Sequence, residues 1–102
     1  MISILLARQG DSVVMDFDGH AGYAERGSDI VCAGASALAF TLIQRLINMD
    51  DVKVEHEEGD GKMHIFAKGA RTKEPVDTIA TGFRLLADTY PKHIVFFEEE
   101  EA

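Results

Sequence analysis

SDIVCAGASALAFTLIQRLIN, residues 28–48, is the stretch that decides the fold. Ser28 and Asp29 are residue types that commonly cap a helix N-terminus, and the run from Ile30 to Asn48 is long enough for about five helical turns. Almost every position in this run is apolar, on all sides of the expected helix. Because a helix that is apolar all round must be covered all round, we expect one side to pack on a sheet and another to meet a second helix or a second subunit.

Two strands and a loop precede this helix. Ile2–Ala7 is a short apolar run with β-branched residues, Gln9-Gly10-Asp11 is a turn, and Val13–Phe17 alternates as a strand does. These three segments predict a hairpin. Asp18–Gly27 then holds three glycines among polar residues, and a loop of this length in a small domain suggests a function. We expect this loop to be mobile in the free protein.

Two further strands, a second helix and a last strand follow. Val52–Glu57 and Lys62–Ala67 predict a second hairpin, joined through Gly59-Asp60-Gly61. Glu74-Pro75 opens a helix whose apolar stripe continues to Tyr90, because proline is tolerated in the first helical turn. His93–Phe97 predicts the last strand.

The order ββαββαβ predicts an α+β fold with two layers, in which two helices pack on a mixed or antiparallel sheet. The 102 residues fit one domain spanning 1–102. A composition of 46% hydrophobic and 27% charged residues is typical of a soluble globular domain.

The net charge of -8 argues against direct binding of nucleic acid or anionic membrane and suits a basic partner. The N-terminal apolar run is too short for a signal peptide, and no stretch approaches the roughly 20 apolar residues that span a bilayer. We therefore expect a cytoplasmic protein whose one cysteine stays reduced. The acidic run Glu98–Glu101 is expected to be frayed and solvated.

The one cysteine is the first candidate for chemistry. If Asp29 caps the helix, Cys32 is the third helical residue, where free N–H groups and the positive end of the helix dipole stabilise a thiolate. These N–H groups are also candidate donors to an oxyanion. Inert packing is the alternative, since cysteine is often buried. His20, in the glycine-rich loop just before the helix, is the candidate general base, and a plain surface histidine is its alternative.

Two polar residues near Cys32 have more than one interpretation. Asp29 can cap the helix, orient His20 or hold a substrate amide. Ser36 is four residues after Cys32 and shares its helix face. Its hydroxyl can touch the thiol or bond the backbone carbonyl of Cys32.

The other histidines give no strong case for a metal site. His56 and His64 pair across the second hairpin if its loop has three residues, and face opposite sides if it has two. Two ligands alone make a poor metal site, so we expect neither metal nor other cofactor. His93 is expected to be structural or exposed.

Three short segments form a specific pattern: GHAGYA at residues 19–24, DIVCA at 29–33 and SAL at 36–38. This pattern closely resembles the ribosomal-processing cysteine protease (Prp) family, and the resemblance covers essentially the whole chain. It implies a catalytic dyad of His20 and Cys32. Asp29, Ser36, Gly22 and Tyr23, within or beside these segments, are the candidate substrate-binding or orienting residues.

The resemblance also implies an activity and a partner. The activity is removal of the N-terminal extension of a basic large-subunit ribosomal protein during ribosome biogenesis, by a homodimeric enzyme. The chain departs from the family at Gly34 and Ala35, where members usually have alanine and valine, which raises a question about substrate fit. The alternatives are a non-catalytic dimeric module that binds a basic ribosomal protein, and a redox-sensing thiol protein.

Overall fold

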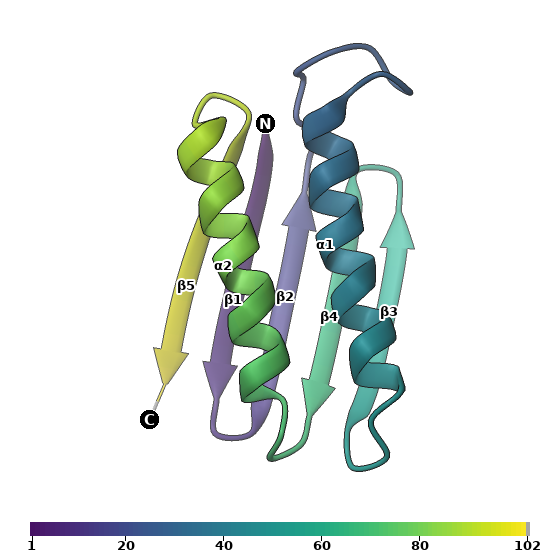
Figure 1. Ribbon diagram of the computed structural model, residues 1–102, viewed down its shortest axis with the longest axis vertical. Coiled ribbons are helices and arrows are strands. Elements are labelled where there is room, and N and C mark those ends of the chain that lie inside the picture. Colours follow the sequence, from purple (N-terminus) through teal and green to yellow (C-terminus); the bar gives the residue numbers. More distant parts are fainter. Residues whose placement is uncertain (102) are drawn as a thin grey trace.

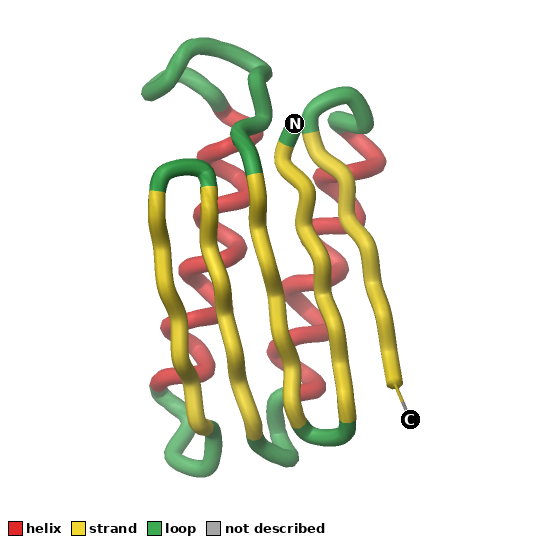
Figure 2. Tube along the Cα trace, turned by 180° about the vertical axis from the view of Figure 1, so that it is seen from behind, coloured by secondary structure: helices red, strands yellow, loops and turns green. Residues whose placement is uncertain are grey.

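The computed structural model describes residues 1–101 and contains seven elements. These are β1 (Ile2–Gln9), β2 (Ser12–Asp18), α1 (Ile30–Ile47), β3 (Lys53–Gly59), β4 (Lys62–Lys68), α2 (Lys73–Thr89) and β5 (Ile94–Glu101). Both helices cover one face of a single five-stranded sheet (Figure 1), and the view from behind shows the other face uncovered (Figure 2). The predicted ββαββαβ order and two-layer α+β fold are confirmed.

The sheet has the strand order β3-β4-β2-β1-β5. β5 runs parallel to β1 and every other pair is antiparallel, so the sheet is mixed. Each hairpin closes through two residues, since Gln9 pairs with Ser12 and Gly59 pairs with Lys62. The second hairpin loop is therefore Asp60-Gly61.

The core lies between the helices and the sheet. Alternate residues of the strands face the helices, as the period of two requires, and one side of each helix faces back. The largest fully buried side chains are Phe83, Ile4, Leu6, Met15, Leu42, Ile43, Leu46, Ile65, Ile94, Val31 and Val76. Both hairpins and both helices contribute to this set, so the whole chain forms one core.

The two helices contact each other through glycines. A Cβ added to Gly34 of α1 would lie 3.6 Å and 3.7 Å from the two terminal methyls of Leu86 of α2, which is ordinary contact. In the reverse direction, Leu38 of α1 covers Gly82 of α2, with both terminal methyls 3.0 Å from an added Cβ. Gly34 therefore belongs to the helix–helix contact. Its expected bearing on substrate fit stays a prediction.

The acidic run Glu98–Glu101 is not frayed. It forms the second half of β5 and pairs with β1 as far as Gln9 opposite Glu101. The backbone of β1 supplies the hydrogen bonds, and Arg84 donates to both carboxylate oxygens of Glu98, at 2.8 Å and 2.6 Å. The hydrogen bond from Arg84 lowers the pKa of Glu98 despite partial burial. Strand pairing therefore holds the backbone while the carboxylates remain near solvent.

Helix α1 keeps several apolar side chains exposed. Ile30, Phe40 and Ile47 are 57%, 45% and 49% exposed. By length and composition alone, this helix is also long and apolar enough to cross a membrane, in contrast to the expectation that no stretch of the sequence would be. Its other side packs on the sheet through Val31, Ala35, Ala39, Leu42, Ile43 and Leu46. Within residues 1–101, the outer side of α1 is the side that stays exposed.

Candidate active site

Cys32 lies in the first turn of α1, where the sequence predicted it. Asp29 is the N-cap residue, so Cys32 is the third helical residue, and its side chain is half-buried. Two adjoining cavities, of about 530 Å³ and 570 Å³, are both lined by Cys32, His20 and Ser36. The fold therefore brings the two predicted dyad residues to the walls of one hollow.

The Asp29 carboxylate joins the helix to the glycine-rich loop. Its Oδ1 accepts from the backbone N–H groups of Val31 and Cys32, at 3.0 Å and 2.9 Å. Its Oδ2 accepts from those of Tyr23 and Ala24, at 3.0 Å and 3.3 Å. Burial alone would raise the pKa of Asp29, but these four hydrogen bonds together lower it below the ordinary value. Of the roles considered for Asp29, the structure shows the cap, and adds a clamp on the loop.

This clamp corrects one expectation about the chemistry. The N–H groups of Val31 and Cys32 are occupied by Asp29, so they are not free to hold an oxyanion. The negative charge of Asp29 also opposes the positive helix end that would stabilise a thiolate. A nearby cation, such as protonated His20, is the group that would balance a thiolate here.

His20 contacts the turn between β3 and β4. Its Nε2 lies 3.4 Å from Oδ1 of Asp60, and a Cβ added to Gly61 would lie 2.9 Å from the same nitrogen. The backbone N–H of Gly19 donates to the carbonyl of Gly61 at 2.8 Å, which fixes the loop to this turn. Within residues 1–101, the imidazole makes no hydrogen bond to the sulfur of Cys32. In this structure the imidazole of His20 lies beside Asp60 and not on the thiol.

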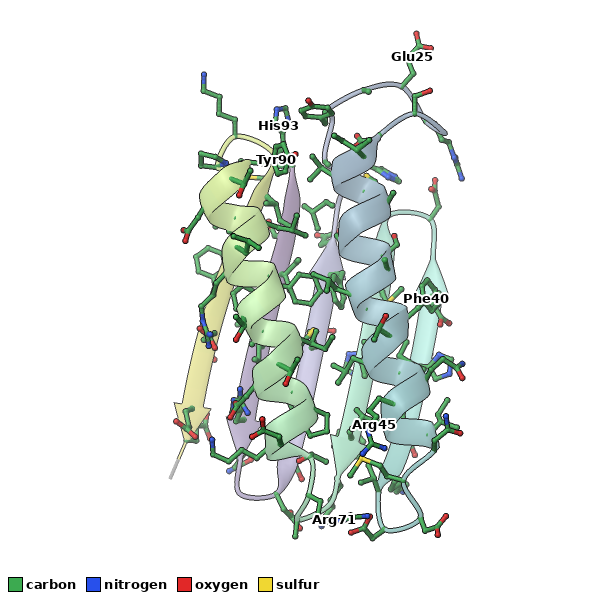
Figure 3. The ribbon with its side chains drawn as sticks, in the orientation of Figure 1. Glu25, Phe40, Arg45, Arg71, Tyr90 and His93 are labelled. Carbon is green, nitrogen blue, oxygen red and sulfur yellow. The ribbon has the colours of Figure 1, made fainter. Side chains whose placement is uncertain are left out.

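The sulfur of Cys32 has a different partner. The backbone N–H of Ala21 donates to Sγ at 3.3 Å, and the carbonyl of Ala21 accepts from Nδ1 of His93 at 3.0 Å. His93 belongs to the connection between α2 and β5, and Figure 3 places it beside Tyr90 at the loop end of the molecule. His93 is half-buried and structural, one of the two expectations for it, whereas its contact with Ala21 and the contact of Asp60 with His20 were not predicted, because the partners are distant along the chain. The only sequence features that pointed to His93 and Asp60 were their residue types, a histidine and an aspartate, at predicted loop positions.

The remaining predicted residues take different places. Gly22 lines the 570 Å³ cavity with a φ of +67°. Tyr23 packs edge-on against Tyr90 and His93, with ring centroids 5.5 Å and 5.3 Å away, so its ring anchors the loop. The Ser36 hydroxyl makes neither expected contact, with the thiol or with the Cys32 carbonyl, among the described residues, and lines both cavities instead.

These contacts divide the loop into two parts. Residues 19–24 are held by Gly61, Cys32, Asp29 and the ring cluster around Tyr23. Residues 25–28 have fewer ties: the N–H of Ser28 donates to the carbonyl of Glu25, and Arg26 reaches toward Asp60 at 3.8 Å. Any mobility of the loop is therefore expected at this tip, not over its whole length.

The other histidines and cavities lie apart from Cys32. His56 and His64 occupy adjacent ladder positions and so face opposite sides of the sheet, paired with Glu58 and Asp16. Among residues 1–101, no group of three or more potential ligands is arranged to hold a metal ion. A larger cavity, about 630 Å³, lies at the opposite end of the molecule, where Figure 3 labels Arg45 and Arg71. Neither a cysteine nor a histidine lines it, so we place the site at Cys32.

Comparisons with known proteins give a consistent result. The sequence model of the family described as cysteine protease Prp matches residues 1–95. The ribosomal processing cysteine protease Prp of Staphylococcus aureus is 28% identical over 101 residues, which cover 92% of this chain and 95% of that protein. The Mycoplasma genitalium protein of the same name is 33% identical over 88 residues, covering 79% and 83%.

Solved structures agree with these sequence matches. An essential ribosomal processing protease Prp from S. aureus, in complex with a covalently linked product peptide, superposes with a TM-score of 0.78 at 27% identity. The match covers 96% of this chain and 99% of that one. SMU.848 from Streptococcus mutans, at 24% identity, shares the fold with a TM-score of 0.72, covering 99% and 96%.

Proposed function

Because this chain belongs to the Prp family of cysteine proteases, we propose that it removes the N-terminal extension of a basic large-subunit ribosomal protein during ribosome biogenesis. Cys32 is the nucleophile, and His20 is its general base and the proton donor to the leaving group. The observation that carries this proposal is the position of the chain's one thiol, which lines the same two cavities as His20.

The mechanism follows from the two side chains. His20 leaves Asp60, approaches Cys32 and accepts the thiol proton, and the sulfur then attacks the scissile carbonyl carbon. The tetrahedral intermediate collapses to a thioester as the C–N bond breaks, and His20 gives its proton to the leaving amine. Water, deprotonated by His20, hydrolyses the thioester and returns the thiol. No cofactor enters any of these steps.

The nature of the substrate rests on the relatives and on charge. Members of the family are named ribosomal processing proteases, and two S. aureus structures hold a substrate peptide or a product peptide. The net charge of -8 favours a basic partner over nucleic acid. We place the protein in the cytoplasm, where a single thiol stays reduced.

We further infer a homodimer formed through the outer side of α1. Ile30, Ala33, Ala37, Phe40 and Ile47 are all exposed and recur at helical spacings of three, four, three and seven. They form an apolar stripe along the helix that Gln44 interrupts between Phe40 and Ile47. Such a stripe is typical of a surface that packs against another helix. Two-fold self-association is the commonest way to cover it.

The dimer can be tested with two matched substitutions. Phe40→Glu places a charge in the stripe, whereas Phe97→Glu places one on β5, where Phe97 is 54% exposed. Sedimentation should show a monomer for Phe40→Glu and a dimer for Phe97→Glu. A monomeric wild type at micromolar concentration would contradict the inference.

The protease activity is tested by incubating the protein with a precursor ribosomal protein and measuring intact masses. The expected product is the precursor without its N-terminal extension, and a precursor that already lacks the extension should stay unchanged. Cys32→Ala is the enzyme control. Binding of the precursor without cleavage would favour the non-catalytic module. Reversible oxidation of Cys32 without cleavage would favour a redox-sensing thiol.

A further inference from the structure

The backbone of Ala21 connects Cys32 to a histidine far away in the sequence, through its N–H on one side and its carbonyl on the other. Ala21 is 1% exposed. Its N–H donates to Cys32 Sγ at 3.3 Å, and its carbonyl accepts from His93 Nδ1 at 3.0 Å. Because a carbonyl oxygen can only accept, Nδ1 of His93 carries the proton in this contact. These two hydrogen bonds hold the backbone of Ala21 between Cys32 and His93.

His93 is itself held firmly enough to act as an anchor. Its backbone N–H donates to the carbonyl of Tyr90 at 2.9 Å, and its ring stands edge-on to Tyr23 with centroids 5.3 Å apart. The next residue, Ile94, is buried at the start of β5. The imidazole therefore approaches the loop from the turn that leads directly into β5.

The other polar groups near the sulfur of Cys32 are engaged elsewhere and do not orient it. The N–H of Cys32 itself is taken by Asp29, and His20 rests on Asp60. Among the described residues, the N–H of Ala21 is the group that donates a hydrogen bond to Sγ. A donor aimed at the sulfur favours the negative charge that a nucleophilic thiolate carries.

We propose that His93 is a positioning residue for the nucleophile: by holding the carbonyl of Ala21, it keeps the N–H of Ala21 aimed at the sulfur of Cys32. His93 acts through Ala21 and touches neither the sulfur nor the scissile bond. This role deepens the proposed function and rests on it. The other explanation is that His93 only stabilises the loop.

Two amide substitutions separate the explanations, because they place a donor at different points. In His93→Asn the side-chain nitrogen lies where Nδ1 was, and in His93→Gln it lies closer to the former position of Nε2. Both side chains are polar and of similar size, so a general effect on the fold should be shared. His64→Leu, which removes a histidine paired with Asp16 on the sheet, is the control for loss of an unrelated imidazole.

The readouts are the second-order rate of alkylation of Cys32 by iodoacetamide at pH 7, kcat and KM for the precursor, and the midpoint of thermal unfolding. His93→Gln should lower both the alkylation rate and kcat by about tenfold, the ratio expected for one hydrogen bond to a charged group. His93→Asn should remain within about threefold of wild type, with KM changed little in either variant. His64→Leu should match wild type.

Equal alkylation rates in wild type and His93→Gln would overturn the proposal. So would equal losses in His93→Asn and His93→Gln that follow their unfolding midpoints, since that is the pattern of a purely structural role. If wild type alkylates as expected but cleaves no precursor, the proposed function fails, whereas the dependence of thiol reactivity on His93 still stands or falls by the alkylation rates alone.

Discussion

The two hairpins of this protein each turn through one glycine and one aspartate, in opposite order, and have different surroundings. The β1–β2 hairpin turns through Gly10-Asp11 and the β3–β4 hairpin through Asp60-Gly61, and Gly10 and Gly61 have φ values of +59° and +67°. Nothing lies within 4 Å of a Cβ added to Gly10, whereas one added to Gly61 would meet His20 at 2.9 Å. Figure 1 shows the reason: the β3–β4 turn lies at the end of the sheet where α1 begins, and the β1–β2 turn lies at the other end. The β3–β4 turn is part of the site because of its place in the topology, and not because of its residue types.

The largest effect expected at the active end is that of removing the sulfur. Cys32→Ala should reduce cleavage of the precursor by at least about a thousandfold, because Cys32 is the one cysteine of the chain. Stability should change by about 1–2 kcal/mol, since only a small side chain is lost. Cleavage is measured by intact mass and stability by urea unfolding. Full activity in Cys32→Ala would remove the cysteine protease assignment.

The comparison of the two turns is itself testable with one alanine in each. Gly10→Ala and Gly61→Ala should both cost about 1–2 kcal/mol of stability, because both positions require the left-handed backbone region. Only Gly61→Ala should also lower kcat/KM, by about 10- to 100-fold, since it displaces the imidazole of His20. If both variants lose activity equally, the β3–β4 turn is not part of the catalytic site.

The Asp29 clamp gives the next effect. In Asp29→Asn the amide oxygen can still cap α1, but the amide NH₂ then faces the N–H groups of Tyr23 and Ala24, and two donors cannot bond. We expect kcat/KM to fall about tenfold with most of the stability kept, whereas Asp29→Ala also loses the cap, at about 0.5–2 kcal/mol. Activity in Asp29→Asn equal to wild type would mean that the loop clamp is dispensable.

The clamp also has a pH dependence with a defined sign. The folded state lowers the pKa of Asp29 below its ordinary value of 3.8, so its contribution to stability is complete above that value. It is lost as the pH falls through the lower folded value. Asp29→Asn should remove this part of the acid dependence, which urea unfolding between pH 2 and 5 would reveal.

The sequence predicted what is local and missed what is distant. The helix start at Asp29, the position of Cys32 and both hairpins follow from caps, periodicity and turn residues. Two contacts depend on the order of the strands in the sheet. They are the contact of His20 with Asp60 and the contact of His93 with Ala21, which lie 72 positions apart. No residue pattern near His93 indicates that it contacts the loop. The contact of Gly34 with Leu86 could not be predicted for the same reason, because Leu86 belongs to the other helix.

The smallest expected effect concerns the contact between α1 and α2, which involves neither hairpin turn. Gly34→Ala should raise stability by about 0.5–1 kcal/mol, because glycine is a poor helix residue and the new methyl would meet Leu86 at an ordinary distance. Gly82→Ala offers the same gain in helix propensity, but its methyl would lie 3.0 Å from both methyls of Leu38, which must move aside. We therefore expect a higher urea midpoint for Gly34→Ala than for Gly82→Ala, with kcat/KM of Gly34→Ala unchanged. A loss of activity in Gly34→Ala without loss of stability would instead tie this glycine to the substrate and contradict its assignment to the helix contact.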